Sequence, residues 1–179
     1  MKEFIFEKAV LYLDNISQRQ NFKFIKSLLG EHISVIFDVG CHKGETIDLI
    51  LKFFKVEKIY AFEPNKILIN KIDKSKYLNT EFINKALGEK KQSKKFFKSE
   101  FSPVNSLHKI NPETNYSKFK QKIINFFFSK NHPKEENIDV ITFDYFCKKY
   151  KIKSVDLLKI DTEGYEYYIL QGAIKNLKK

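Results

Sequence analysis

The chain has 179 residues, of which 42% are hydrophobic and 31% are charged, a composition typical of one globular domain with a substantial core. No apolar run is long enough to span a bilayer, and charges interrupt the apolar N-terminal residues. We therefore expect neither an integral membrane segment nor a signal peptide, and a cytoplasmic location. Two cysteines allow no disulfide framework, and no cluster of histidine and cysteine has metal-ligand spacing, so we expect no metal site.

The charge balance is strongly basic. Lysine and arginine number 33 and aspartate and glutamate 22, which gives a net charge of +11. A surplus of this size is found in many proteins that bind nucleic acid or anionic membranes. Here the lysines are spread along the chain in doublets, and no block is dense enough to form a basic arm. We therefore expect no nucleic-acid partner, although the charge can favour an anionic substrate.

The first half of the chain alternates between helical and extended patterns. Its start has the apolar spacing of one or two amphipathic helices, closed by Gly30 as a C-cap. Three strand-length apolar runs follow, separated by two segments with helical spacing, the second of which begins at the N-cap Asn65. The predicted helices are residues 1–30, 45–55 and 65–75, and the predicted strands are residues 33–40, 58–64 and 80–88. This alternation is typical of a parallel sheet with right-handed crossovers.

The second half is less regular. Residues 93–99 form a candidate short strand, a turn-rich segment follows, and residues 116–129 have helical apolar spacing. Residues 137–150 read as a strand that continues into a helix with Thr142 as its N-cap. A buried strand at residues 154–164 and a helix at residues 165–176 complete the pattern. The predicted fold is α/β, with a Rossmann-like, doubly wound and mostly parallel sheet.

The turn after the first strand, DVGCHKG at residues 38–44, is the first candidate site. Ligands of doubly wound sheets bind at the carboxyl ends of the strands, and Gly40 and Gly44 would let a ligand approach the backbone. The dinucleotide fingerprint needs a glycine where this turn has His42, which argues against a nicotinamide oxidoreductase. Asp38 suits a cationic group instead, such as the ammonium or sulfonium of S-adenosylmethionine. Cys41 lacks a recognisable base and is expected to be a small turn residue near the ligand.

Acidic residues at the ends of two other predicted strands form the second and third candidate sites. Glu63 follows a buried strand about 20 residues beyond the glycine turn, where an acid accepts hydrogen bonds from ribose hydroxyls. Asp161 and Glu163 stand at alternate positions, so a strand would project both to one side. These acids could bind an ammonium group, orient a hydroxyl or hold a cation. Pro64 and Asn65, beside Glu63, are included in the predicted binding set.

These motifs, in this order, resemble the FkbM family of S-adenosylmethionine-dependent methyltransferases. The most specific match is the strand D-L-L-K-I-D-x-E-G followed by a helix that ends near L-x-G-A. The resemblance covers roughly residues 33–175 and rests on VIFDVGCHKGETI (35–47), IYAFEPN (59–65), NKALGEKKQSKKFF (84–97), NSL (105–107), VITFDYF (140–146) and VDLLKIDTEGYEYYILQGA (155–173).

The resemblance implies a role for each matching position. Asp38, Gly40 and Gly44 would surround the methionine part of S-adenosylmethionine, and Glu63 would bind its ribose. Ala86 and Leu87 would lie beside the adenine. The family implies an O-methyltransferase that acts on a hydroxyl of a glycan or another small metabolite.

The acceptor side of the reaction needs a group that aligns a hydroxyl and helps to remove its proton. The resemblance places Asp161 close to the methyl-transfer site and Glu163 in support of it. Asp161 is our first candidate for orienting or deprotonating the hydroxyl, and His108, just after NSL, is the second.

The chain departs from the family pattern at its C-terminal end. A full sheet of this class has seven strands, and the chain ends soon after the last predicted strand. We therefore expect that the C-terminal strands are missing and that the strand at 154–164 forms an exposed edge, which a second copy of the chain could cover. The expected organisation is a helical segment at 1–32 and a methyltransferase domain at 33–179. The alternative function is a non-catalytic cofactor-binding or assembly module.

Overall fold

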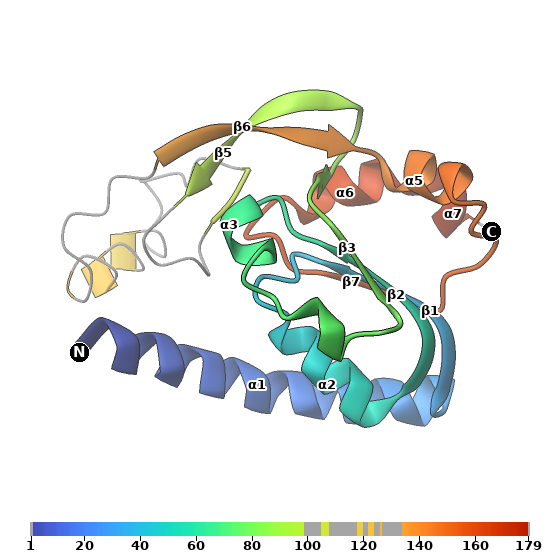
Figure 1. The fold of residues 1–179 in the computed structure, drawn as a ribbon, viewed down its shortest axis with the longest axis horizontal. Helices are drawn as coiled ribbons and strands as arrows, with labels where there is room; N and C mark the ends of the chain where they lie inside the picture. The colour runs from blue at the N-terminus through green and yellow to red at the C-terminus, as the bar shows by residue number, and fades with distance from the viewer. Residues whose placement is uncertain are drawn as a thin grey trace.

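A four-stranded parallel sheet forms the centre of the molecule (Figure 1). The computed structural model describes residues 2–98, 105–107, 118–119, 122–123, 126 and 134–178. The strand order is β3-β2-β1-β7, and each neighbouring pair is parallel. The strands are β1 (His32–Val39), β2 (Lys55–Phe62), β3 (Thr80–Ile83) and β7 (Leu157–Ile160). This arrangement confirms the predicted α/β fold. In the described part of the chain β7 is an edge strand, with β1 as its only partner.

A second sheet of three strands lies beside the central one, in the order β4-β6-β5. Its strands are β4 (Ala86–Leu87), β5 (Gln92–Lys98) and β6 (Lys134–Ile141), and β5 pairs with β6 in antiparallel fashion. The prediction of one strand over residues 80–88 was wrong, because β3 and β4 belong to different sheets. The side chain of Asn84 donates hydrogen bonds to the carbonyls of Glu63 and Pro64, both at 2.9 Å, and turns the chain away from the end of β2.

Helices cover both faces of the central sheet (Figure 1). One face carries α1 (Lys2–Leu29) and α2 (Glu45–Phe53), and the other carries α5 (Phe143–Lys149), α6 (Glu166–Gln171) and α7 (Ile174–Leu177). Successive residues of β1 pack into opposite cores: Ile36 belongs to the cluster with Phe22 of α1, and Phe37 to the cluster with Phe143 of α5. The absence of apolar–polar alternation in β1 is thus explained, because its second half is buried on both faces of the sheet.

The helix predictions were correct in place but not always in length. The N-terminal segment is a single helix that ends before Gly30. Asn65 caps α3 (Lys66–Ile69), as predicted, but this helix is short and is followed by the 3₁₀ turn η1 (Lys74–Lys76). Thr142 caps α5 through a 3.0 Å hydrogen bond from the Tyr145 amide, also as predicted.

The last predicted helix, residues 165–176, is two helices, α6 and α7. The break has a tertiary cause, because the carboxylate of Asp144 in α5 accepts hydrogen bonds from the amides of Lys175 and Asn176 at 3.0 and 3.1 Å. This carboxylate caps the start of α7, a role that no neighbour in sequence could reveal.

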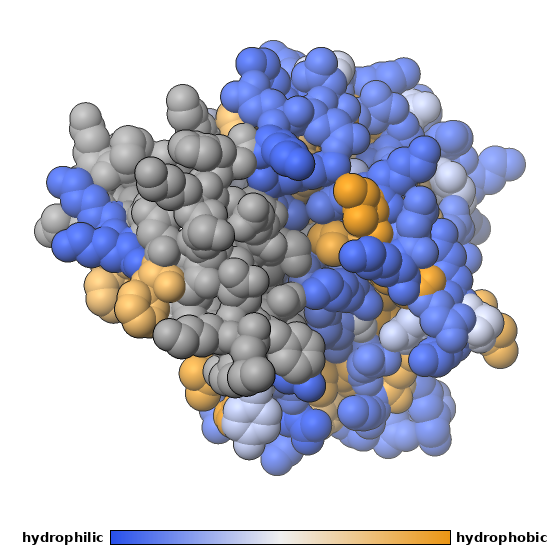
Figure 2. Space-filling view, turned by 60° about the vertical axis from the view of Figure 1, so that its left-hand side comes forward, coloured by the Kyte–Doolittle hydropathy of each residue, from blue (hydrophilic) through white to orange (hydrophobic). Residues whose placement is uncertain are grey.

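The predicted strand at 93–99 is confirmed as β5, whereas the predicted helix at 116–129 lies largely outside the described residues. None of the helices in the described part of the chain combines the length and apolarity needed to cross a membrane. On the face seen in Figure 2, hydrophilic residues predominate and hydrophobic ones form small groups.

Candidate functional site

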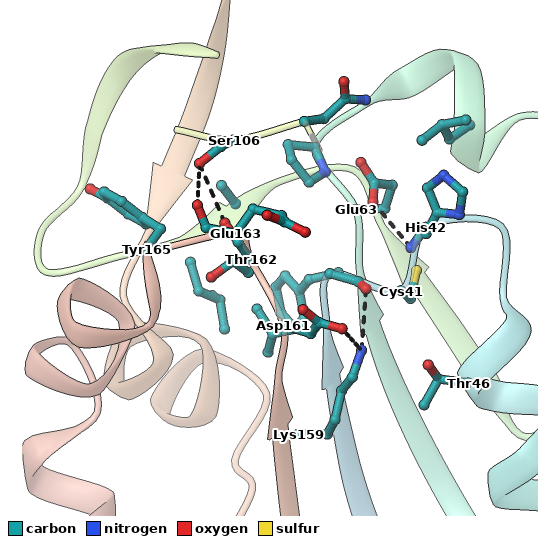
Figure 3. A pocket seen from close by; sticks show the side chains of 18 of the residues that line it. Cys41, His42, Thr46, Glu63, Ser106, Lys159, Asp161, Thr162, Glu163 and Tyr165 are labelled. Atoms are coloured by element: carbon teal, nitrogen blue, oxygen red, sulfur yellow. Dashed lines mark hydrogen bonds and ion pairs between the residues drawn. The ribbon is translucent and has the colours of Figure 1, made fainter. Parts of the chain in front are cut away.

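A cavity of about 310 Å³ lies where the carboxyl ends of β1, β2 and β7 meet. This is the edge at which doubly wound sheets bind their ligands, and the volume falls at the lower end of the range for small-molecule sites. Most of the predicted site residues line the cavity. They are Gly40, Cys41, His42, Glu63, Pro64, Ala86, Leu87, Asp161 and Glu163. Figure 3 shows how the side chains from the three strand ends converge on the same space.

Four predicted residues are placed otherwise. Asp38, Gly44 and Asn65 are not among the residues that line the cavity. Asn65 acts as the cap of α3, and its amide donates a hydrogen bond of 2.7 Å to the Glu63 carboxylate. His108 lies outside the described residues.

Asp38 is buried and is not among the residues that line the cavity. Its side chain is fully buried, and Lys159 stands opposite it in the register of β1 and β7. Oδ1 of Asp38 lies 3.0 Å from Nζ of Lys159. Burial raises the pKa of Asp38, an effect that the nearby ammonium opposes. The sequence predicted a cationic group of S-adenosylmethionine beside Asp38, and in the structure the cation in contact with it is Lys159 of the same chain.

The two glycines of the first turn also have structural reasons of their own. Gly40 has a φ of +85°, and a Cβ at this position would lie 1.9 Å from the main-chain oxygen of Asp161. The position of a side chain at Gly40 is therefore occupied by the turn after β7, while Gly40 also lines the cavity. Gly44 has a φ of +91° and precedes the first residue of α2, so it serves to start that helix.

Glu63 is held by the main chain at the cavity wall. Its side chain is buried, and its carboxylate accepts hydrogen bonds from the amides of Asn65 at 2.7 Å and His42 at 3.1 Å. Burial raises the pKa of Glu63 to about 7, although both amides oppose this effect. Each carboxylate oxygen accepts one amide proton and retains acceptor capacity for a second hydrogen bond. Glu63 is therefore a fixed acceptor that faces the cavity.

The acids after β7 lie in a turn and not on the strand. Because β7 ends at Ile160, the predicted strand alternation does not govern Asp161 and Glu163, and Glu163 has a φ of 55°. The turn is held by the carboxylate of Glu166, which accepts hydrogen bonds from the amides of Thr162 and Gly164 at 2.8 and 3.2 Å. Both acids nevertheless line the cavity.

Asp161 and Glu163 differ in what holds them. The Asp161 side chain is 56% exposed, and its Oδ2 lies 3.7 Å from Nζ of Lys159. The Glu163 carbonyl accepts a 2.9 Å hydrogen bond from the hydroxyl of Ser106, which also lines the cavity (Figure 3). Sequence reasoning included Ser106 in the NSL match but gave it no role.

Helix α1 supplies part of the cavity wall, and sequence reasoning missed this. Val10, Asp14 and Gln18 line the cavity at a spacing of four residues, which places them on one face of the helix. Gln18 donates a 2.7 Å hydrogen bond to Asp14 and accepts one of 3.3 Å from the hydroxyl of Thr46 in α2. The i, i+4 spacing of Asp14 and Gln18 was visible in the sequence, but nothing local indicated that this face meets the strand ends.

The cavity is acidic although the protein is basic. Burial, reinforced by the charge of Asp161, raises the pKa of Asp14. Burial would also raise the pKa of Glu45, but hydrogen bonds from His42 and from the Lys43 amide outweigh it and lower the pKa. The carboxylates in the lining are Asp14, Glu45, Glu63, Asp161 and Glu163, and the lysines are Lys85 and Lys159. Such a lining favours a ligand with positive charge.

Among the residues described, no group of three or more histidine, cysteine or acidic side chains is arranged to hold a metal ion. Cys41 is buried, and burial followed by the charge of Asp38 raises the pKa of its thiol well above the usual value. A thiol with a raised pKa carries little of the thiolate form that acts as a nucleophile.

Comparisons with known proteins agree with this geometry. A solved structure of methyltransferase FkbM from Methylobacillus flagellatus KT is similar to the chain, with a TM-score of 0.52 and 16% identity. The match covers 84% of this chain and 32% of that protein, so the chain spans about a third of its length. At this identity the likeness shows a shared fold.

A second solved structure, from Anaeromyxobacter dehalogenans and assigned as a type II methyltransferase, has a TM-score of 0.31 and 18% identity over 38% of this chain and 27% of that one. This likeness is too weak to support an argument. No curated protein matches the chain. The sequence family described as the methyltransferase FkbM domain matches residues 38–179, which include the three strand ends that form the cavity. The chain therefore belongs to the FkbM methyltransferase family.

Proposed function

We propose that the protein is an S-adenosylmethionine-dependent methyltransferase that methylates a hydroxyl of a glycan or another small metabolite. The observation that carries the proposal is the single cavity in which Glu63 after β2 and Asp161 after β7 face the same space beside the turn at Gly40. Membership of the FkbM family supports the reaction type.

The residues present fit S-adenosylmethionine. Glu63, with acceptor capacity left on both oxygens, would bind the ribose hydroxyls. Ala86 and Leu87 are buried apolar residues in the lining and would pack against the adenine. The acidic side chains of the wall suit the positive charge of the sulfonium and ammonium groups, and because Asp38 is paired with Lys159, we assign this role to the exposed acids and not to Asp38.

The chemistry required of the protein is limited. Bound S-adenosylmethionine would supply the methyl group and a neutral thioether as leaving group. The protein must then hold the acceptor hydroxyl in line and accept its proton. Asp161 is the best-placed group, because it lines the cavity and is half exposed, so an acceptor can reach it. Glu163 supports the turn that carries it.

Calorimetric titration with S-adenosylmethionine and with S-adenosylhomocysteine tests the cofactor assignment. We expect micromolar binding by the native protein and a loss of at least about tenfold in Glu63→Gln, since a buried hydrogen bond to a charged acceptor is worth roughly 1.5–3 kcal/mol. Glu57→Gln is the matched control, because Glu57 lies exposed on the same strand.

Three outcomes of this titration are distinguishable. No binding by a folded sample would refute the proposed cofactor. Equal binding by Glu63→Gln and the native protein would refute the role of Glu63. Binding without methyl transfer to any of a panel of glycans and hydroxyl-bearing metabolites would favour the non-catalytic module.

A further inference from the structure

Lys159 is a largely buried lysine in the wall of the cavity, and the reaction described above leaves it without a role. Its side chain is 17% exposed, and its Nζ lies 3.0 Å from Oδ1 of Asp38 and 3.7 Å from Oδ2 of Asp161. The same nitrogen donates a 3.4 Å hydrogen bond to the carbonyl of Gly40. One ammonium therefore contacts the end of β1, the glycine turn and the turn after β7, and Figure 3 shows its contact with Asp161.

The ammonium stays charged. Burial acts to lower the pKa of Lys159, but the charges of Asp38 and Asp161 outweigh burial and raise it. A lysine with a raised pKa gives up its proton too reluctantly to serve as a general base near neutral pH. Any role of Lys159 in the site must therefore depend on its positive charge and on the groups that it contacts.

The two carboxylates around Lys159 are in different environments. Asp38 is fully buried, and a buried carboxylate needs a partner whether or not the protein has a reaction to perform. The Asp161 side chain is 56% exposed and could be solvated by water without any partner. Burial therefore does not require the contact with Asp161, whose carboxylate lines the cavity and can be reached by an acceptor.

Nearby negative charges make this contact more important. Asp14 and Glu45 also line the cavity, and the charge of Asp161 contributes to the raised pKa of Asp14. These acids disfavour a third carboxylate that points toward them. An ammonium in the cavity wall draws Asp161 back to a defined place.

We propose that Lys159 is a positioning residue that holds the Asp161 carboxylate in one orientation toward the acceptor hydroxyl. This inference rests on the proposed function for its purpose, but the orientation itself can be measured without cofactor or acceptor. Neutralisation of Asp38 is a second, structural role of the same ammonium, and the two roles can be separated by mutation.

The test compares Lys159→Met with the double variant Lys159→Met/Asp38→Asn. The single variant leaves the Asp38 carboxylate buried without its partner, so we expect its midpoint of thermal unfolding to fall by roughly 10 °C. In the double variant no buried charge remains at this place, and the midpoint should return to within about 3 °C of the native value. The double variant thus removes the structural role and keeps the protein folded.

The decisive measurement is the side-chain rotamer of Asp161, read from three-bond NMR couplings about its Cα–Cβ bond. In the native protein we expect the couplings of one dominant rotamer, and in the double variant the averaged couplings of several rotamers. Asp144 is the internal control, because its carboxylate is held by hydrogen bonds to α7 and should keep its couplings in both proteins. Unchanged Asp161 couplings in the double variant would overturn the inference.

The outcome is independent of the cofactor question. If the native protein failed to bind S-adenosylmethionine, the proposed function would fail, and the couplings would still decide whether Lys159 orients Asp161. If the cofactor bound and the couplings were unchanged, only the role of Lys159 would be lost.

Discussion

Glu63 and Asp161 are both acids that follow parallel strands of one sheet, yet the structure holds them in different ways. Glu63 is buried, and two main-chain amides determine where its carboxylate lies. Asp161 is half exposed, and its carboxylate lies 3.7 Å from the ammonium of Lys159. One acid is fixed by the backbone, and the other is aimed by a side chain.

This difference suggests a division of labour in the cavity. A rigid acceptor in a buried wall suits recognition of a part of the ligand that does not change, such as a ribose. A carboxylate at an open position suits contact with a proton that must leave. The turn after β1 and the turn after β7 are in direct contact, because the Asp161 carbonyl occupies the space beside Gly40.

The largest expected effect tests the role assigned to Asp161 in the comparison with Glu63. If this carboxylate accepts the proton of the hydroxyl, Asp161→Asn should lower kcat for methyl transfer by about 10²–10⁴-fold. The calorimetric Kd for S-adenosylmethionine should stay within about threefold of the native value. The measurement uses methyl-labelled cofactor and a panel of glycans and hydroxyl-bearing metabolites. Undiminished transfer by the variant would remove Asp161 from the mechanism.

The contact between the two turns is tested by Gly40→Ala. The added methyl would collide with the Asp161 carbonyl and force a left-handed φ on alanine, so we expect a loss of at least about 3 kcal/mol in the free energy of unfolding. Gly30→Ala is the control, since it has a φ of +80° and no atom within 4 Å of the added Cβ. It should lose only about 1–2 kcal/mol. Equal losses in urea unfolding would show that backbone strain alone accounts for Gly40.

The buried state of Glu63 predicts a dependence of stability on pH. Because its pKa is raised from 4.5 to about 7 in the folded protein, the folded state binds the proton more tightly than the unfolded chain between these values. This contribution is therefore present below pH 4.5 and is lost as the pH rises through 7, by up to about 3 kcal/mol. Glu63→Gln should lack this component when urea unfolding is compared at pH 4.5 and pH 8. An identical pH dependence in the variant would contradict the burial argument.

The smallest expected effect concerns Asp14, an exposed acid of the cavity lining. Asp14→Asn should weaken binding of S-adenosylmethionine by about threefold, because a partly exposed charge pair contributes up to about 1 kcal/mol. Binding of S-adenosylhomocysteine, which lacks the sulfonium charge, should change less. Asp73→Asn, at the exposed N-cap of η1, provides the control. Equal weakening of both ligands would place Asp14 away from the sulfonium.

Sequence patterns correctly predicted the features of the fold that depend on neighbouring residues, such as buried strands and helix caps. The strand β1 lacks apolar–polar alternation because both faces of its second half are buried. The caps at Asn65 and Thr142 satisfy amides of their own helices. The family motifs placed Glu63 and Asp161 at strand ends, and parallel strands bring their carboxyl ends to one edge. The sequence alone therefore led to the fold, to the edge that carries the cavity and to nine of the residues that line it.

Tertiary structure decided which partner each of these residues meets. The register of β1 and β7 sets Lys159 opposite Asp38, and the Asp161 carbonyl occupies the position of a side chain at Gly40. Neither contact could be predicted from the local sequence. Asp14, Gln18 and the split between α6 and α7 depend on contacts across the fold. A sequence pattern specifies which chemical groups a strand or helix presents, whereas burial, charge pairing and close packing depend on residues far apart in the chain, which only the folded arrangement brings together.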